Sequence, residues 1–336
     1  MAVRLKDIAQ DLGVSTVTVS KVLRGKSDIS DRTRTLVLKR MRELNYQPNI
    51  QARGLASGRS FAVGLVVPDL VHPFFGEFAK SLGGALRESG LALVLASSEE
   101  DPKIERQEIR TLLNRGVDVL LVASCQAQTS KGLFSEQANT PFLLIDRNFP
   151  ALSANFVGSN DVKVGELATR HLIEIGRKRI AHIGGEGISP SVGRLEGYRK
   201  ALASARIKVP RNFVVTRQRT EEKGDSAGYQ AMQELLSRET LPDAVFCYND
   251  LTAIGAMKAA VEANLRIPQD IAFVGCGNLR YAEYLKVPLT SIDHETDRMG
   301  QIAAKLALDL ARTPAQPPQT ILLEPKLIVR QSSLSQ

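Results

Sequence analysis

Several side chains between residues 15 and 25 could read the edges of DNA base pairs. The stretch STVTVSKVLRG has helical spacing, and one of its sides carries Thr16, Val17, Ser20, Lys21 and Arg24. A lysine donates to guanine acceptors, a threonine hydroxyl bonds to several base edges, and a valine contacts the thymine methyl group. The flanking cations, which suit phosphate contacts, are Arg24, Lys26 and Arg32. This chemistry predicts DNA binding, with a three-helix module that binds protein as the alternative.

A second group of candidate residues follows apolar, strand-like runs further along the chain. In open parallel α/β sheets, the ligand crevice lies beyond the carboxyl ends of the strands. The residues directly after these runs are therefore candidates for binding a small molecule. They are His72, Phe74, Phe75, Ser124, Asp146, Arg147, Asn249, Asp250 and Asn278. Among them, we expect Phe74 and Phe75 to form the wall and core of the crevice.

The sequence carries no recognisable motif for catalysis or metal binding. The glycine-rich HIGGEG at 182–187 lacks the G-x-G-x-x-G and P-loop patterns, so we interpret it as a loop leaving a strand. The four histidines include no H-E-x-x-H pair, and no G-x-S-x-G elbow is present. Cys125, Cys247 and Cys276 lie far apart in apolar runs, which indicates buried free thiols in a reducing cytosol. We expect no enzyme activity, no cofactor and no metal.

The basic charge is concentrated in the first sixth of the chain. Residues 1–60 hold 12 Lys and Arg against 5 Asp and Glu, whereas the remainder holds 32 against 31. A small basic module ahead of a nearly neutral body indicates a polyanionic partner for the module alone. No apolar run approaches the roughly 18 residues of a membrane span, and the first residues lack the apolar segment of a signal peptide. We therefore expect a cytoplasmic protein.

The elements that position the first group of residues read as a helix-turn-helix. Leu5, Ile8, Ala9 and Leu12 recur at helical spacing before Gly13, which is typical of a helix end. Ser15 is a candidate N-cap for the second helix and Ser30 for the third. The residues expected to face inward from these two helices are Val19, Val22, Leu23, Leu36, Val37, Met41 and Leu44. Helix, short turn with glycine, helix and supporting helix together predict this motif.

The body of the chain, from residue 61, alternates apolar strands with amphipathic helices. FAVGLVVPD, LALVLASSE, VDVLLVAS and PFLLID form one series, and RIAHIGG, FVVT, DAVFCYND and IAFVGCG form another. Nearly continuous apolar strands between helices imply parallel sheets covered on both faces. The number of elements favours two similar lobes over a single sheet.

Residues 45–60, NYQPNIQARGLASGRS, join the two parts. Pro48 and Asn49 could start a helix of about two turns, which is marginal in water by itself. Ala52, Leu55 and Ala56 form an apolar stripe along it, although a plain linker is the alternative.

Seven segments resemble, in order and spacing, transcription regulators of the lac-repressor/galactose-repressor family, over essentially the whole chain. The segments are LKDIAQDLGVSTVTVSKVLRG, YQPNIQARGLASG, GLVVPDLVHPFFGEF, LLIDRNF, RLEGYRKAL, YNDLTAIGAMKA and PLTSID. The helix-turn-helix followed by P-N-x-x-A-R-x-L is their most specific feature. The resemblance implies an all-α headpiece with a hinge helix, and an α/β core of two doubly wound parallel-sheet lobes that resembles periplasmic binding proteins.

The resemblance also implies how DNA is held. Thr16, Val17 and Lys21 would contact bases, and Lys21 replaces a more usual arginine, so it lacks the bidentate fork. Asn49 to Leu55 would fold as a hinge helix only on operator DNA, beside its dimer mate. Leu55 would then enter the minor groove as a wedge, and the other hinge contacts would be Asn49 and Arg53.

By the same resemblance, an effector would bind between the lobes, near Arg194, Asn249 and Asp250. Several positions depart from the family pattern. Gly277 replaces an acidic residue, and the aligned positions that gain donors are His72, Lys223 and His294. Cationic donors favour carboxylate or phosphate groups, so we predict an anionic effector, either a sugar acid or a sugar phosphate. A neutral-sugar effector, with Lys223 facing solvent, is the alternative.

These inferences give a domain layout and a mode of action. We expect a headpiece at 1–46, a hinge at 47–60 and a core at 61–336. The lobes would be roughly 61–160 with 292–319, and 161–291 with 320–330. A homodimer would bind a pseudo-palindromic operator, since the final QSSLSQ is too short for a tetramerisation helix. A phosphocarrier-protein corepressor remains open but needs a surface on the first lobe, and a periplasmic solute-binding protein would have no use for residues 1–60.

Overall fold

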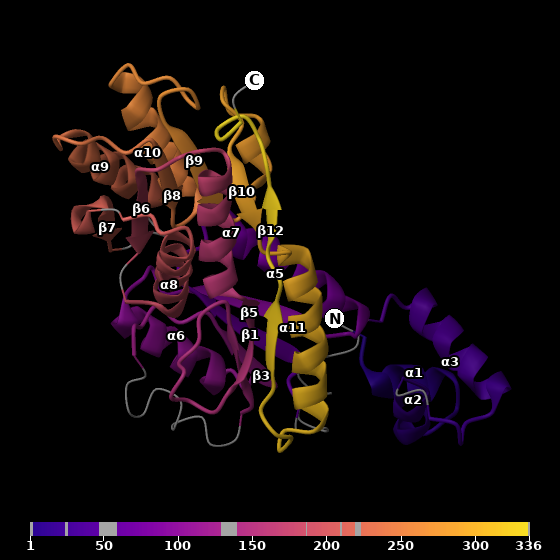
Figure 1. Ribbon diagram of the computed structural model, residues 1–336. Coiled ribbons are helices and arrows are strands. Elements are labelled where there is room, and N and C mark those ends of the chain that lie inside the picture. Colours follow the sequence, from indigo (N-terminus) through magenta and orange to yellow (C-terminus); the bar gives the residue numbers. More distant parts are fainter. Residues whose placement is uncertain are drawn as a thin grey trace. The chain divides into compact units, whose positions relative to one another are not determined.

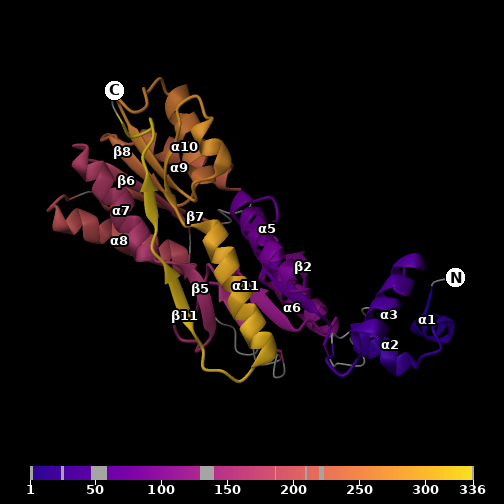
Figure 2. The same cartoon turned by 90° about the vertical axis from the view of Figure 1, so that its right-hand side faces the viewer.

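The computed structural model of the chain describes two compact units, Met1–Ser60 and Phe61–Gln336 (Figure 1, Figure 2). Residues 3–23, 26–46, 59–128, 140–185, 187–208, 210–218 and 223–334 are described. None of the helices in these ranges is long and apolar enough to span a membrane.

The first unit is a three-helix bundle: α1 (Leu5–Asp11), α2 (Thr16–Leu23) and α3 (Asp31–Glu43). The predicted glycine ends α1, since Gly13 has a φ of +62°, which other residues rarely adopt. The hydroxyl oxygens of Ser15 and Ser30 accept the backbone N–H groups of Thr18 and Thr33, as expected of N-caps. The bundle encloses a small core of Ile8, Ala9, Val19, Val22, Val37 and Met41.

Two leucines that the helical pattern directed inward lie on the surface instead. Leu23 is 38% exposed and Leu36 is 49% exposed. The reason is the small size of the bundle, because Val37 and Met41, four residues apart, already fill the stripe of α3 that faces the other helices. Residues neighbouring that stripe are left outside it.

The first lobe of the second unit is a six-stranded parallel sheet with the order β11-β5-β4-β3-β1-β2. Its strands are β1 (Ala62–Val67), β2 (Ala92–Ser97), β3 (Val119–Val122), β4 (Phe142–Ile145), β5 (Asn155–Ser159) and β11 (Thr320–Leu323). Helices α5 (Pro73–Glu88) and α11 (Thr296–Arg312) share one apolar cluster with the sheet, and α6 (Pro102–Asn114) belongs to another. The predicted parallel sheet covered by helices is confirmed here.

The second lobe has a similar sheet with the order β12-β10-β9-β8-β6-β7, in which only β12 is antiparallel. Its strands are β6 (Ile180–Gly185), β7 (Val214–Arg217), β8 (Ala244–Cys247), β9 (Ala272–Cys276), β10 (Thr290–Asp293) and β12 (Lys326–Ile328). Helices α7 (Asp161–Glu174) and α8 (Ser189–Ser204) pack as a pair, and α9 (Gly224–Leu236) packs with α10 (Asp250–Glu262). Short 3-10 helices are η2 (Arg211–Phe213) and η3 (Arg280–Glu283).

The chain passes between the lobes three times, between β5 and α7, between β10 and α11, and between β11 and β12 (Figure 1). The expected assignment of 320–330 to the second lobe is therefore wrong in part. Strand β11 pairs with β5 in the first sheet, and only the segment from β12 onward joins the second. Likewise β10, at 290–293, lies wholly in the second sheet, so the return to the first lobe follows it. Both corrections have one cause, since a strand belongs to the sheet whose edge hydrogen-bonds it.

Candidate functional site

The outer face of α2 presents the side chains expected to read DNA. Val17 is 58% exposed although it is apolar, and Thr16 is exposed beside it. Ser20 and Lys21 are half-buried on the same helix. A solvent-exposed apolar side chain on such a small bundle can contact a binding partner.

Part of the predicted DNA-contacting set lies outside the described residues. This part comprises Arg24, Asn49, Arg53 and Leu55. The hinge helix and the minor-groove wedge therefore remain predictions from the sequence.

Lys21 is bound by a carboxylate within its own unit. Its Nζ lies 2.5 Å from Oδ2 of Asp28, in the segment between α2 and α3. The hydrogen bond from Lys21 holds the pKa of the Asp28 carboxyl below its usual value. The amine expected to reach a base edge thus already has an anionic partner.

The ends of the two sheets meet at a small polar cavity between the lobes. Its volume is about 20 Å³, and the residues that line it are His72, Phe74, Phe75, Asp146, Arg194, Tyr248, Asn249, Cys276, Gly277 and His294. Asp146 follows β4, Asn249 follows β8 and His294 follows β10. This arrangement follows the rule that ligands of parallel sheets lie beyond the carboxyl ends of the strands.

Arg194 is the central cation of this cavity. Its Nε donates to Oδ1 of Asp161 at 2.9 Å, and its Nη1 donates to the carbonyl of Tyr248 at 2.7 Å. The guanidinium also lies over the Tyr248 ring, 4.6 Å from its centroid. Burial works against the charge of Arg194, but surrounding negative groups, Asp161 among them, hold its pKa above the usual value. The cation is therefore permanent and largely compensated by Asp161.

Close packing of two helices positions this ion pair. Asp161 opens α7 and Arg194 lies on α8. A Cβ at Gly165 would lie 2.0 Å from the carbonyl oxygen of Arg194, and one at Gly197 would lie 2.0 Å from that of Val162. Only glycine permits this approach, so the two glycines bring the carboxylate of one helix within reach of the guanidinium of the other.

His294 is a neutral member of the cavity wall. Burial and the nearby charge of Arg194 hold its pKa well below the usual value. Its Nε2 lies 3.4 Å from Nη2 of Arg194 and 3.1 Å from Sγ of Cys276. Because a guanidinium only donates, Nε2 is the acceptor and Nδ1 carries the proton. Burial raises the pKa of the Cys276 thiol, so this cysteine is protonated as well.

Two contacts join the lobes at the cavity. Nδ2 of Asn249 lies 3.4 Å from Nε2 of His72, and the rings of Phe74 and His294 meet edge to face at 6.0 Å. In each pair, one residue comes from the first lobe and the other from the second. A ligand that alters these contacts would alter the relative orientation of the lobes.

Two predicted site residues of the first lobe support its structure rather than line the cavity. The hydroxyl of Ser124 donates to Oε1 of Glu105 at 2.8 Å. Arg147 donates from Nη1 to the carbonyl of Ser124 at 3.1 Å, and its guanidinium lies 6.0 Å from the ring centroid of Phe75. Both side chains are buried. Neither residue is among those that line the cavity, and their direct contact with an effector stays a prediction.

Two predicted residues of the second lobe are also engaged elsewhere. Asp250 is fully buried and accepts the hydroxyl of Ser291 at 2.6 Å and the N–H of Leu279 at 2.8 Å. Burial raises its pKa to about 6. Asn278 accepts from Arg330 at 2.8 Å and donates to Asp293 at 3.2 Å. These bonds hold the turn after β9 in place, which leaves neither residue in the cavity lining.

Lys223 was expected at the cavity and is not among the residues that line it. It is exposed and forms the N-cap position of α9, next to Gly224, where an added Cβ would lie 3.4 Å from Oδ1 of the lining residue Asn249. A contact of Lys223 with an effector stays a prediction. Within the described residues, Arg194 is the only lysine or arginine that lines the cavity, and Asp146 adds a carboxylate.

Sequence reasoning missed Tyr248 and Cys276 as wall residues. Tyr248 directly follows β8 and Cys276 ends β9, whereas the residues considered at these two places began one position later, at Asn249 and Gly277. Extending the rule by one residue toward the strand would have found both.

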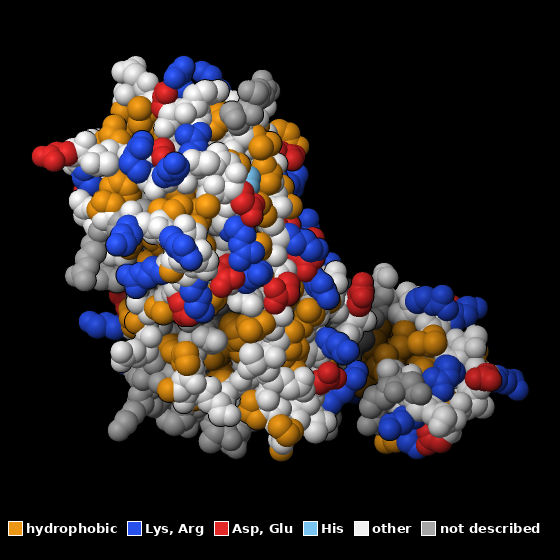
Figure 3. Space-filling model, in the orientation of Figure 1, with side chains coloured by type: hydrophobic (Ala, Val, Ile, Leu, Met, Phe, Trp, Pro, Cys, Tyr) orange, Lys and Arg blue, Asp and Glu red, His pale blue; other side chains and the backbone are white. Residues whose placement is uncertain are grey.

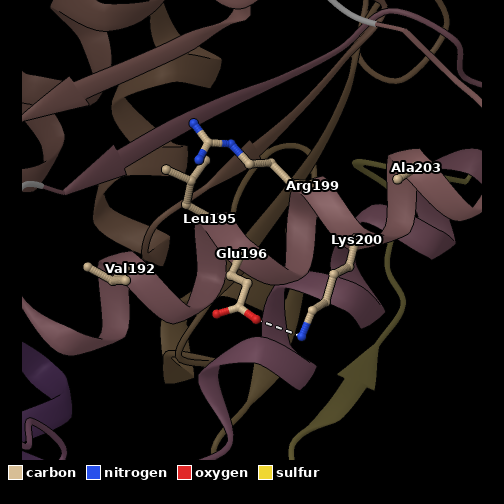
Figure 4. Close-up of a pocket in the computed structure, with 6 residues that line it drawn as sticks. All are labelled: Val192, Leu195, Glu196, Arg199, Lys200 and Ala203. Atoms are coloured by element: carbon tan, nitrogen blue, oxygen red, sulfur yellow. Dashed lines mark ion pairs between the residues drawn. The ribbon is translucent and has the colours of Figure 1, made fainter. Parts of the chain in front are cut away.

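A groove on the outer surface of α8 is a weaker candidate site. Val192, Leu195, Glu196, Arg199, Lys200 and Ala203 line it, all from one helix (Figure 4). Glu196 and Lys200 pair with each other at 2.6 Å. On the face of the core seen in Figure 3, acidic and basic side chains are interspersed.

A helix-turn-helix unit with an exposed reading face, joined to a two-lobed core with a polar cavity, defines a ligand-responsive DNA-binding regulator. Residues 4–49 match the family described as bacterial regulatory proteins of the lacI family, and residues 169–333 match a periplasmic binding protein-like domain. The HTH-type transcriptional repressor PurR of Klebsiella pneumoniae is 33% identical over 98% of this chain and 96% of that protein. The ribose operon repressor of Escherichia coli is 32% identical over 98% and 99%.

Solved structures agree. The lac repressor dimer bound to operator and the anti-inducer ONPF is 25% identical, with a TM-score of 0.87 over the whole of both chains. The transcriptional regulator CelR in complex with cellobiose is 31% identical, with a TM-score of 0.74 over 98% of this chain and 99% of that one. The chain belongs to the lacI family of bacterial regulatory proteins. It is a DNA-binding transcription regulator and not an enzyme.

Proposed function

We propose that this protein is a homodimeric repressor that binds a pseudo-palindromic operator, and that a small neutral sugar in the inter-lobe cavity controls its affinity for DNA. The observation that carries the proposal is the cavity around Arg194, lined from both lobes by polar side chains. The chain crosses between the two lobes three times, so a ligand that changes the orientation of one lobe relative to the other affects the whole core. A ligand shifts such an equilibrium only by its differential affinity for the two arrangements.

The charge of the cavity supports a neutral effector over the anionic one predicted from the sequence. Asp161 compensates Arg194, Asp146 adds a carboxylate, and His294 is neutral. An acidic ligand would meet one compensated cation and an additional negative charge. Hydroxyl groups suit the cavity better because they can donate to Asp146 and accept from Arg194, Asn249 and the histidines.

The cavity is almost closed. Its volume of about 20 Å³ is close to the space that one water molecule needs and far below the roughly 300–1,000 Å³ typical of ligand pockets. A sugar would therefore enter only when the two lobes move apart. A family member from Enterococcus faecium was solved with bound ribose, and it is 27% identical with a TM-score of 0.72 over 82% of this chain and all of that one. The ribose-bound relative supports a monosaccharide as the effector.

Homodimerisation is supported by apolar side chains that are exposed on the core. Tyr284 is 79% exposed and Val71 is 87% exposed. Tyr284 lines a groove with Tyr281, and α5 contributes Pro73 and Glu77 to it. Exposed apolar residues clustered in this way are typical of a contact surface. We propose that a second copy of the chain covers them.

A thermal-shift panel tests the effector class. Neutral monosaccharides are compared with the matching sugar acids and sugar phosphates on the full chain. A ligand at 100 times its Kd adds about 2.7 kcal/mol to the free energy of unfolding. We expect shifts with neutral sugars alone. A shift confined to acids or phosphates would restore the anionic prediction.

A variant of the hinge tests the DNA-binding mode. If Leu55 is a minor-groove wedge, Leu55→Ala should weaken binding to a selected operator at least about tenfold while changing binding to random duplex DNA little. Fluorescence anisotropy at fixed salt measures both affinities. Equal losses on the two duplexes would exclude the wedge.

A further inference from the structure

Lys21 lies on the outer face of α2 and forms an ion pair with a carboxylate. Reading a base pair does not require such a contact. Its ammonium lies 2.5 Å from Oδ2 of Asp28. The two side chains are 38% and 55% exposed. The pair therefore stands at the surface, where DNA can reach both members.

The folded bundle fixes the position of Asp28. Two residues before it, the carbonyl of Lys26 accepts a hydrogen bond of 2.6 Å from Nη2 of Arg34 on α3. One residue after it, Ile29 packs against the buried core of the bundle. The carboxylate is thus anchored on both sides and is held beside Lys21 rather than meeting it by chance.

The other described cations around this face are not restrained in this way. Within the described residues, neither Lys26 nor Arg32 forms a side-chain ion pair. Arg40, which pairs with Asp11 and Glu43, lies on α3. The charge of Lys26 also helps to lower the pKa of Asp28, but the ion pair that Asp28 forms is with the base-reading lysine.

We propose that Asp28 competes with DNA for Lys21 and so limits the affinity of the headpiece. The inference rests on the proposed operator binding. DNA must take Lys21 from a carboxylate before the amine can reach a base edge, and the displaced carboxylate then lies close to the phosphates. An exposed ion pair is weak enough for this exchange to occur.

The test is Asp28→Asn in the full chain, since asparagine keeps the size but loses the charge. The probe is a duplex that the wild-type protein selects from a random-sequence library. We expect binding to tighten about 3–10-fold, because an exposed pair accounts for a few-fold in affinity and two headpieces act together. Asp11→Asn is the matched control, as it removes one paired carboxylate from the same unit, and it should change affinity less than about twofold.

A double-mutant cycle decides whether Lys21 mediates the effect. In a Lys21→Met background, Asp28→Asn should tighten binding less than about twofold. An equal gain in both backgrounds would reduce Asp28 to a general charge effect and overturn the competition. Unchanged or weaker binding by Asp28→Asn, with a folded variant by circular dichroism, would overturn it as well. If the wild-type protein selects no duplex, operator binding itself fails, which is a separate result.

Discussion

The headpiece and the core cavity both contain a cation paired with an aspartate, and the two pairs have opposite consequences. Lys21 and Asp28 are exposed and can exchange partners with DNA. Arg194 is buried and Asp161 is largely buried, at 5% and 13% side-chain exposure, and neither can lose its partner without leaving a charge in a low-dielectric interior. The same chemistry therefore gives an adjustable contact at the surface and a fixed framework inside. Four predictions test this contrast.

The largest effect is expected from breaking the buried pair. Arg194→Ala should lower the free energy of unfolding of the core by about 3–5 kcal/mol, because it leaves the Asp161 carboxylate buried without a cation. Urea denaturation measures the change. Lys200→Ala breaks an exposed pair on the same helix and should leave the stability unchanged. Similar losses in the two variants would contradict the contrast.

The second prediction separates the two units. Met41→Ala should destabilise the headpiece by about 2–5 kcal/mol, since Met41 is one of few buried side chains in a very small core. DNA binding measured by anisotropy should then be lost, while the ligand-induced thermal shift of the core should persist. If both were lost, the units would not be independent.

The third prediction concerns pH and the core alone. His182 is stacked against Tyr198 and Phe246, and burial lowers its pKa to about 4. The unfolded chain therefore binds a proton first as the pH falls. Stability from this group is present above about pH 6.5 and is lost between 6.5 and 4, by about 3 kcal/mol.

His182→Phe keeps the stacking and should make this loss smaller, as measured by urea denaturation at several pH values. The loss would not vanish, because burial also lowers the pKa of His171 and of His294. Residues 1–60 contain no histidine, so the headpiece should not share the dependence. An unchanged pH profile in the variant would show that His182 does not contribute.

The smallest effect is expected at a residue that the sequence placed in the site. Lys223→Ala should leave the affinity for an effector unchanged within about twofold, because an exposed cation outside the cavity contributes little. Isothermal titration with whichever ligand the thermal-shift panel identifies measures this. A tenfold loss would mean that Lys223 reaches the ligand.

Two cavity-lining residues that the sequence analysis named share one local feature, their position after an apolar strand. Asp146 and Asn249 follow apolar strands, and the ends of parallel strands meet at one edge. Ser124 follows a strand as well, yet its hydroxyl turns to Glu105, a partner 19 residues earlier. Strand ends can be predicted, but the direction of a side chain there depends on a neighbour that only the packed structure supplies.

The lobe boundary near the C-terminus shows the same limit. Strands β11 and β12 are short apolar segments separated only by Glu324 and Pro325, and they join different sheets. Nothing in their composition distinguishes them, because each sheet edge accepts any strand of suitable pattern.

The sequence by itself determined the helix-turn-helix, the alternation of strands and helices, and the concentration of positive charge before residue 61. These are local properties of spacing, capping and composition. The tertiary structure alone decided which charges are paired. Lys21 gained a partner seven residues away, Arg194 gained one 33 residues away, and Lys223 stayed in solvent. Charge pairing depends on distance and burial, and both are set only when segments far apart in the chain pack together.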